Sequence, residues 1–343
     1  MAETGKLSAP DAPFLLAEFA RHKAAAADDP HINPVARLAS ELFLALEQGE
    51  TSIAALSAAA SRLGDDAFEE RAREFHGRRA GSRDIGEALT DLAEKGFDAF
   101  RETVERARAG VVFTAHPTFA LGAAKRDLIA RFPGGDAAAL KAWREELAAL
   151  AAAKKDDITL RYEHDEARKA IENAQEALRA LNAAIIETAR KTFPRKWAGL
   201  RPNPVSIASW VGYDLDGRSD IHWGESIRIR IFEKAVQLRR YEVTLAGIVE
   251  TLRDGDLDAL QAEIGQAALL AERQAEAFAG DLHDADVVVA AANLLTGDEP
   301  GRLVSLAPAI RAITAKIDAT DDAAAKTALI LLRAEIEACG LGL

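Results

Sequence analysis

Two short runs of apolar and β-branched residues constrain the fold of this chain most, because nearly everything else has the pattern of helices. The first predicts a strand at about residues 111–115, and the second predicts one at about residues 205–210. Polar residues follow each run directly. A histidine or a pair of aspartates just past the end of a buried strand is where barrel enzymes place their chemistry. The two runs therefore predict more than a plain helical bundle.

Outside these runs, apolar residues recur three and four positions apart, which is the spacing of amphipathic helices. A long helix is expected from Glu163 to Phe193, ending before Pro194. The stretch from Asp281 to Arg302 is the most irregular and is expected to be a loop. Residues 1–12 are polar and are expected to be flexible, which leaves 13–343 as a single helical region that carries the two strands.

Composition excludes several classes of protein. The formal net charge of −12 over 343 residues argues against nucleic acid as a partner, because phosphate binding needs clustered Lys and Arg. Cys339 is the single cysteine, so no internal disulfide can form, which fits a reducing compartment. No run of about 18 apolar residues occurs and the start carries no apolar signal core, so we expect no membrane span and a cytoplasmic location.

The first polar cluster is Thr114-Ala115-His116-Pro117-Thr118. A histidine titrates near neutral pH, so one that is held rigidly at a strand end can accept or donate a proton. The proline that follows it fixes the turn. The alternative interpretation is a histidine that only caps the strand with its hydrogen bonds, and the pattern alone leaves both open.

The second polar cluster runs from Trp210 to Arg218 and places Asp214 and Asp216 at alternate positions of a turn bounded by glycines. Such a pair could bind a divalent metal, orient an arginine or bind a ligand. On the pattern alone, an aspartate-rich turn that satisfies its own backbone is favoured. The remaining histidines have no metal-ligand spacing and are expected in surface or capping roles: His22, His31, His164, His222 and His283.

Taken together and in this order, the two clusters resemble the T-A-H-P-T and W-M-G-G-D-R-D-G-N-P motifs of phosphoenolpyruvate carboxylases. The resemblance covers about residues 35 to 343, which correspond to the smaller, amino-terminal part of a family member. Phe119 replaces the glutamate that usually follows the first motif. Gly122 and Ala123 stand where two arginines are usual, with Lys125 and Arg126 one helical step further on. In the second motif, the replacements are Tyr213, Leu215, Arg218 and Ser219.

The resemblance implies a mainly α chain, the helix-rich amino-terminal part of an (α/β)8 barrel with only about two of its strands. It implies a reaction that joins phosphoenolpyruvate and bicarbonate to give oxaloacetate and phosphate, by way of carboxyphosphate and an enolate. Mg²⁺ or Mn²⁺ would be required, with its ligands expected outside this chain. The partners would be the remainder of the barrel and further copies, since family members are usually tetramers.

The resemblance also implies roles for individual residues. His116 would be catalytic: it would take the proton of carboxyphosphate and help to hold its phosphate. Trp210 would wall a dry pocket for CO2. The rest of the substrate pocket would come from Gly212, Asp214, Asp216, Gly217 and Arg218. Lys125 and Arg126 could compensate for the missing arginines as phosphate-binding residues.

Two other interpretations remain open. The replaced glycine and arginines favour a non-catalytic helical binding or regulatory relative that keeps the strand-end motifs for structure. A metal-dependent hydrolase that uses His116, Asp214 and Asp216 is a further possibility, and it would require a metal bound by this chain itself. Under the carboxylase interpretation, the isolated chain is expected to be inactive.

Overall fold

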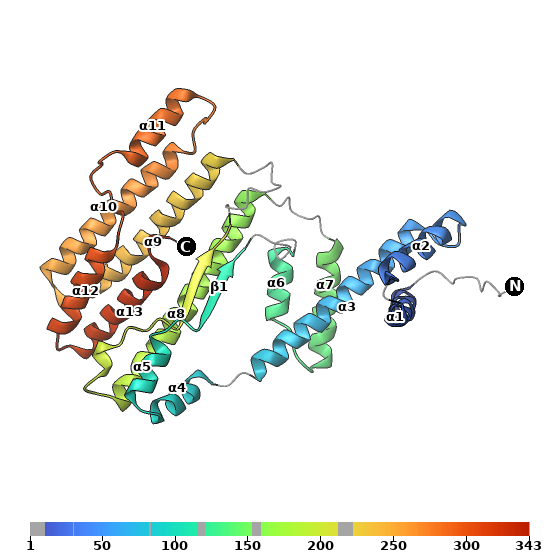
Figure 1. The fold of residues 1–343 in the computed structure, drawn as a ribbon, viewed down its shortest axis with the longest axis horizontal. Coiled ribbons are helices and arrows are strands. Elements are labelled where there is room, and N and C mark those ends of the chain that lie inside the picture. The colour runs from blue at the N-terminus through green and yellow to red at the C-terminus, as the bar shows by residue number, and fades with distance from the viewer. Residues whose placement is uncertain are drawn as a thin grey trace. The chain divides into compact units, whose positions relative to one another are not determined.

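The computed structural model describes residues 11–29, 31–81, 84–114, 121–152, 159–211 and 222–342. These residues form thirteen α-helices, a short 3-10 helix and two strands (Figure 1). The expected helix-rich class is therefore confirmed. No helix in the described ranges combines the length and the apolar character needed to cross a membrane. The chain divides into two compact units, residues 1–82 with 122–155 and residues 83–121 with 156–343.

The first unit packs a small aromatic core between α3 and the helices that follow the first motif. Trp143 stacks on Phe68 with ring centroids 5.9 Å apart and meets Phe132 edge-on at 5.4 Å. The indole Nε1 of Trp143 donates to the Leu128 carbonyl oxygen at 2.9 Å, which satisfies its one buried donor. The helices of this unit are α1 (Ala12–Asp28), α2 (Pro34–Glu47), α3 (Ile53–Ala80), α6 (Ala123–Ala130) and α7 (Ala137–Ala152).

The second unit holds the two strands and the larger hydrophobic core. Its helices are α4 (Ile85–Glu94), α5 (Phe97–Val104), α8 (Leu160–Thr192), α9 (Trp223–Leu252), α10 (Gly255–Ala277), α11 (Ala285–Thr296), α12 (Ala307–Ala319) and α13 (Ala323–Cys339), with a 3-10 turn at Trp197–Gly199. The strands are β1 (Ala109–Phe113) and β2 (Val205–Ser209). Helix α8 begins three residues before the expected start and ends one before the expected end.

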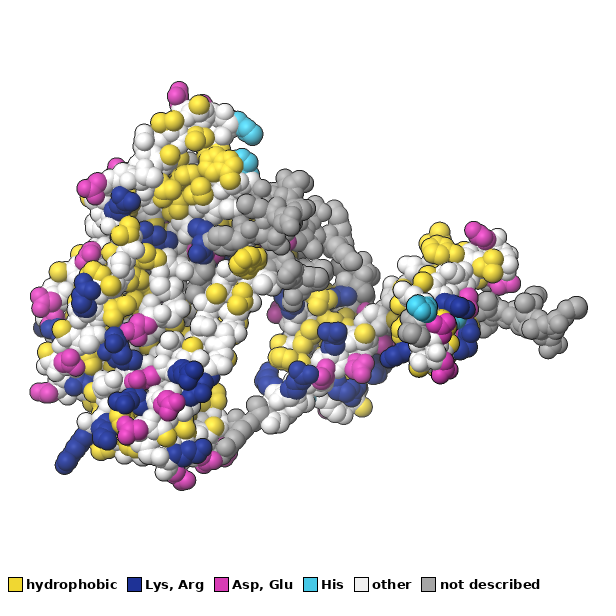
Figure 2. Space-filling view, viewed as in Figure 1, with side chains coloured by type: hydrophobic (Ala, Val, Ile, Leu, Met, Phe, Trp, Pro, Cys, Tyr) yellow, Lys and Arg dark blue, Asp and Glu magenta, His cyan; other side chains and the backbone are white. Residues whose placement is uncertain are grey.

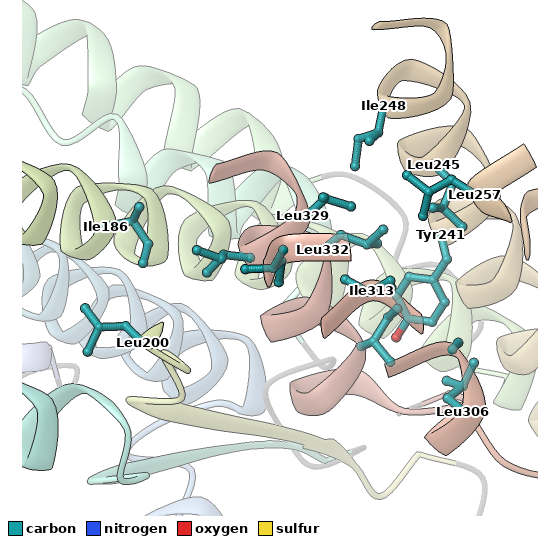
Figure 3. Packing of buried hydrophobic residues seen from close by; sticks show 14 of the residues in the cluster. Ile186, Leu200, Tyr241, Leu245, Ile248, Leu257, Leu306, Ile313, Leu329 and Leu332 are labelled. Atoms are coloured by element: carbon teal, nitrogen blue, oxygen red, sulfur yellow. The ribbon is translucent and has the colours of Figure 1, made fainter. Parts of the chain in front are cut away.

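Helix α13 lies at the centre of this core and packs against α8, α9 and α12. Leu329 and Leu332 of α13 are fully buried, together with Tyr241 and Leu245 of α9 (Figure 3). The Tyr241 hydroxyl donates to the Gly340 carbonyl oxygen at 2.8 Å, so the polar end of this buried ring has a partner. The hydrogen bond ties the end of α13 to α9.

The sequence predicts a loop from Asp281 to Arg302. The structure shows that this prediction is wrong in part, because the stretch contains α11. Asp284 caps this helix by accepting from the backbone N–H of Asp286 at 2.9 Å. Ala291 is buried on the face that packs against α10, where it joins Ala271 and Ala275. The valines of this helix form a continuous β-branched run, Val287–Val289, instead of recurring three and four positions apart, so the sequence does not reveal the helix.

The two strands pair in parallel at the expected places, but β1 is not the buried strand that the sequence predicts. It runs two residues earlier than expected, and Val111 and Val112 are 41% and 58% exposed. Strand β2 instead packs against α13 and buries Ile207. In the described part of the chain, no further strand or helix covers the exposed valines.

Candidate functional site

The carboxyl ends of the two strands lie side by side, which places the starts of both polar clusters at one edge. Phe113 is the register partner of Ser209. The backbone N–H of Trp210 donates to the Phe113 carbonyl oxygen at 2.7 Å, one residue beyond the ladder. Because parallel strands end at the same edge of a sheet, the segments that follow Phe113 and Ser209 both begin there.

The structure places only some of the predicted site residues. His116, Gly212, Asp214, Asp216, Gly217 and Arg218 lie outside the described residues. Trp210 is described, and its residue surface is 56% exposed at the strand edge. Its role as a wall of a dry pocket therefore stays a prediction.

Lys125 and Arg126, the predicted phosphate-binding residues, lie in α6 of the first unit. The Lys125 ammonium nitrogen is 6.0 Å from the centroid of the Phe68 ring, within the range of a cation–π contact. The contact therefore joins Lys125 to another residue of the first unit. Phosphate binding by these two residues remains a prediction.

The carboxylates of the described residues do not fit the Mg²⁺ or Mn²⁺ that the resemblance implies. Among them, only Glu18, His22 and Glu41 bring three potential ligand atoms within 4.8 Å of one another. Arg21 already binds both carboxylates: its Nη2 lies 2.5 Å from Glu18 and 3.2 Å from Glu41. Mg²⁺ prefers an octahedron of oxygen ligands, which a histidine and a resident arginine do not supply.

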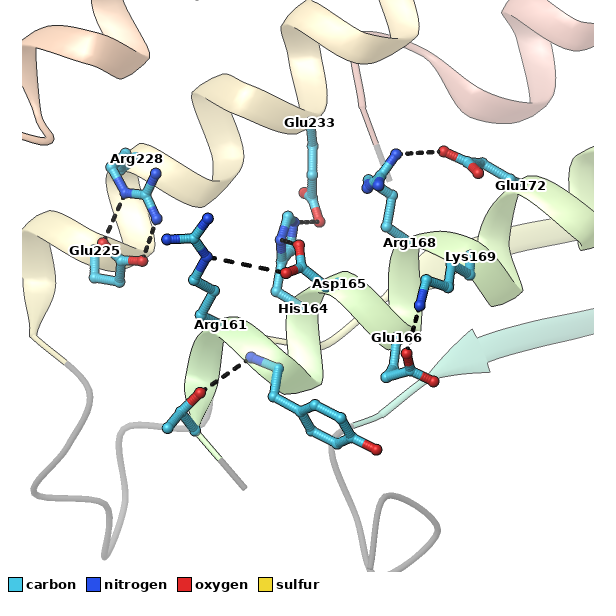
Figure 4. Close-up of polar contacts among 12 residues, drawn as sticks. Arg161, His164, Asp165, Glu166, Arg168, Lys169, Glu172, Glu225, Arg228 and Glu233 are labelled. Atoms are coloured by element: carbon cyan, nitrogen blue, oxygen red, sulfur yellow. Dashed lines mark hydrogen bonds and ion pairs between the residues drawn. The ribbon is translucent and has the colours of Figure 1, made fainter. Parts of the chain in front are cut away.

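A second cluster of charged side chains lies where α8 and α9 begin, and these helix ends lie toward the same end of the unit as the strand ends (Figure 1). Arg161 and Asp165 project from α8, and Glu225 and Arg228 project from α9 (Figure 4). They line a pocket of about 130 Å³ together with His164, Ile229 and Phe232. Arg228 binds Glu225 through two nitrogens, at 2.7 and 2.5 Å.

His164 was expected at the surface or at a helix cap, but the structure buries it to 7% exposure. Its ring meets Phe232 edge-on, with centroids 6.0 Å apart. His222 does take a capping role, because its Nδ1 accepts from the backbone N–H of Gly224 at 3.3 Å. A signal in the sequence could have found His164: together with Gln175 and Asn182, it falls on the stripe of α8 that is otherwise apolar and faces the core.

Glu233 of α9 is the acidic group that faces His164 across the space between the helices. Its Oε1 lies 3.7 Å from His164 Nε2, and its Oε2 accepts from Arg230 at 2.9 Å. Burial raises the pKa of Glu233 to about 7, against the effect of Arg230. Burial also lowers the pKa of His164 from its ordinary value. Burial therefore disfavours the charged form of both groups.

Replacing Glu233 by Gln should make stability less sensitive to alkaline pH. The unfolded chain releases this proton near pH 4.5 and the folded chain near pH 7, so Glu233 removes stability as pH rises through that window. We expect the stability of Glu233→Gln to rise relative to the parent by about 2 kcal/mol between pH 5 and pH 8. Urea unfolding at both pH values measures the difference in stability between the variant and the parent. His164 contributes with the opposite sign, but it is present in both chains, so its contribution largely cancels. The exposed Glu250→Gln on the same helix is the control, and an equal gain in that variant would contradict the assignment.

The face of the molecule in Figure 2 interleaves Lys and Arg with Asp and Glu side chains over its described part. This mixture of signs is unlike the single basic stripe of a nucleic-acid interface.

Comparison with known proteins gives no relative from which a function could be transferred: no family model matches the chain, and no curated protein matches it.

Proposed function

We propose that this chain forms the amino-terminal part of a phosphoenolpyruvate carboxylase-like enzyme, with its active site at the carboxyl edge of β1 and β2. The reaction would join phosphoenolpyruvate and bicarbonate to give oxaloacetate and phosphate. The proposal rests on the resemblance of the two strand-end motifs to those of the family. Only the sequence supports this resemblance.

One structural observation supports the proposal above the others. The hydrogen bond between the Trp210 N–H and the Phe113 carbonyl oxygen holds the two strands together at the point where both motifs begin. The motifs lie far apart in the sequence, and the parallel pairing of β1 with β2 brings their starts to one edge. A shared edge is the arrangement that barrel chemistry needs.

In the proposed mechanism, the phosphoryl group passes from phosphoenolpyruvate to an oxygen of bicarbonate, which leaves carboxyphosphate and the enolate of pyruvate. His116 accepts the proton of carboxyphosphate, whose C–O bond to the phosphate then breaks to give CO2. The enolate carbon attacks this CO2, and His116 returns its proton to the phosphate. Trp210 would help to exclude water, which would otherwise protonate the enolate.

The metal of the resemblance would stabilise the charge on the enolate oxygen and the phosphate when it is bound. The described carboxylates do not fit this metal, whose ligands the resemblance places outside this chain. Asp214 and Asp216 would shape the loop beside the pocket and pair with basic groups.

A non-catalytic binding or regulatory relative is the second candidate function. The exposed faces of Val111 and Val112 favour it, since two strands with uncovered apolar residues offer a surface on which another protein could dock. The loss of the two arginines at Gly122 and Ala123 points the same way.

Oxaloacetate formation by the longest natural form of the protein, coupled to NADH oxidation by malate dehydrogenase, distinguishes the two candidates. The carboxylase proposal predicts turnover that depends on both phosphoenolpyruvate and bicarbonate, and no turnover by residues 1–343 alone. A purified longest form that is folded and inactive with Mg²⁺ and with Mn²⁺ would favour the binding function. Robust turnover by the 343-residue chain would contradict the proposal that its site is incomplete.

A further inference from the structure

Three unsatisfied buried nitrogen atoms surround one small cavity between α8 and α9. They are His164 Nε2, Arg168 Nε and Gln237 Nε2, which have no hydrogen-bond partner among the described residues. All three residues line the same cavity of about 40 Å³. Buried polar atoms are rarely left without partners, because an unmade hydrogen bond costs free energy. Three in one cavity therefore indicate an occupant.

The hydrogen bonds around the cavity determine what kind of group faces it. Gln175 Nε2 donates to Gln237 Oε1 at 2.7 Å, and the same Nε2 lies 3.5 Å from the Cys339 sulfur. The carbonyl oxygen of Gln237 is thereby used, and its NH2 group is the one left over. Gln237 is only 5% exposed, so water outside the protein does not satisfy this donor.

Arg168 Nε is a donor, and His164 Nε2 is a donor in the tautomer that carries the proton there. Arg168 uses Nη1 to bind Glu172 at 2.7 Å, while its Nε–H remains unpaired. His164 is 7% exposed, and its Nε2 is beyond hydrogen-bond distance of Glu233 at 3.7 Å. A neutral imidazole carries one N–H, which can reside on Nε2. Figure 4 shows both side chains rising from α8 toward α9.

An occupant of this cavity must accept hydrogen bonds from three directions and must be small. A water oxygen accepts two hydrogen bonds, so a halide-sized anion fits three donors better, whereas a metal cation would face N–H groups and be repelled. The charges allow an anion: Arg168 is cationic, and Glu233, with its pKa raised by burial, is largely protonated below neutral pH. Glu172 is the opposing charge, and its side chain is 44% exposed to solvent.

We propose that His164, Arg168 and Gln237 form a binding site for a small inorganic monoanion of chloride size. The site is independent of the strand-edge motifs and goes beyond the proposed carboxylase function. An anion bound there would bridge α8 and α9, which otherwise meet through polar side chains and through their shared packing on α13. His164 also lines the larger 130 Å³ pocket, so that pocket is the route by which the ion would enter.

Bromide is the probe, because it replaces chloride and scatters anomalously. We expect a crystal of the 343-residue chain soaked in sodium bromide to show an anomalous peak about 3.3 Å from the three nitrogens. Density of water strength there, without an anomalous signal, would overturn the proposal. So would bromide peaks that occur only at other places on the protein.

A solution experiment tests the same site without crystals. Bromide replaces gluconate at constant ionic strength, and the midpoint of thermal unfolding should rise with bromide concentration. Gln237→Leu removes one donor and should weaken bromide binding about tenfold. Arg168→Lys keeps the charge but removes the Nε–H, so it should also weaken bromide binding. This variant replaces Gln237→Leu in the experiment if Gln237→Leu does not fold.

Lys169→Gln is the matched control, because it removes a positive charge from the neighbouring position of α8. Lys169 pairs with Glu166, is 62% exposed and does not line the cavity. Its bromide response should equal that of the parent chain. An equal loss in Lys169→Gln would show that bromide acts through general screening, and an unchanged response in the Gln237 and Arg168 variants would overturn the site.

Discussion

Replacing His116 by Asn in the longest natural form should lower kcat by about a thousandfold, because Asn cannot take the proton of carboxyphosphate. The amide keeps the approximate size and one hydrogen-bond donor of the imidazole, so we expect KM for phosphoenolpyruvate to change by less than about threefold. Steady-state oxaloacetate formation measures both constants. Far-ultraviolet circular dichroism and the urea midpoint establish that the variant is folded.

His31→Asn is the control for this experiment. His31 is an exposed residue between α1 and α2, and its backbone N–H, which the substitution retains, donates to Asp29 at 3.0 Å. We expect it to leave both constants unchanged. If His116→Asn kept most of the parent's kcat, His116 would be a capping residue of the strand, and the carboxylase proposal would lose its proton acceptor.

Glu335→Ala should be the most destabilising single substitution of a charged residue in the second unit, by about 3 kcal/mol. Glu335 is 6% exposed on α13 and binds two arginines from different helices. Arg179 of α8 donates to it at 3.0 Å, and Arg240 of α9 donates to its other carboxylate oxygen. Without this carboxylate, two partly buried guanidinium groups keep their charge beside an emptied site.

Glu337→Ala, two residues further along the same helix, is the matched control. Glu337 pairs with Arg201 at 3.0 Å, but the Arg201 side chain is 51% exposed, and exposed ion pairs contribute about 0–1 kcal/mol. Urea unfolding of the 343-residue chain at neutral pH gives both values. Equal effects of the two substitutions would contradict the view that Glu335 holds α8, α9 and α13 together.

The strands and the long helices could be predicted from the sequence because their patterns are local. Helix α8 shows a regular apolar stripe, and the two β-branched runs stand out against alanine-rich helices. The exposure of β1 could not be predicted, since Val111 and Val112 have the sequence of a buried strand and only the tertiary structure leaves them uncovered. Helix α11 could not be predicted because its valines form a continuous β-branched run and lack the three-and-four spacing of an amphipathic helix.

The polar interior of the second unit was also beyond sequence reasoning. His164 and Glu233 are 69 positions apart, and only the placement of α8 beside α9 brings them together. The same holds for Gln175 and Gln237, whose side chains bond across the two helices. The strand-edge motifs, by contrast, could be recognised in the sequence. The parallel pairing of β1 with β2 then brings their starts together.

The origin of the oxygen atoms in the released phosphate tests the carboxylase proposal most directly. The longest natural form is incubated with phosphoenolpyruvate and bicarbonate labelled with ¹⁸O, and the phosphate is analysed by mass spectrometry. Transfer through carboxyphosphate predicts one ¹⁸O atom in each phosphate, with oxaloacetate formed in equal amount. Phosphate that acquires its new oxygen from unlabelled water would show hydrolysis instead, and would contradict the proposed reaction.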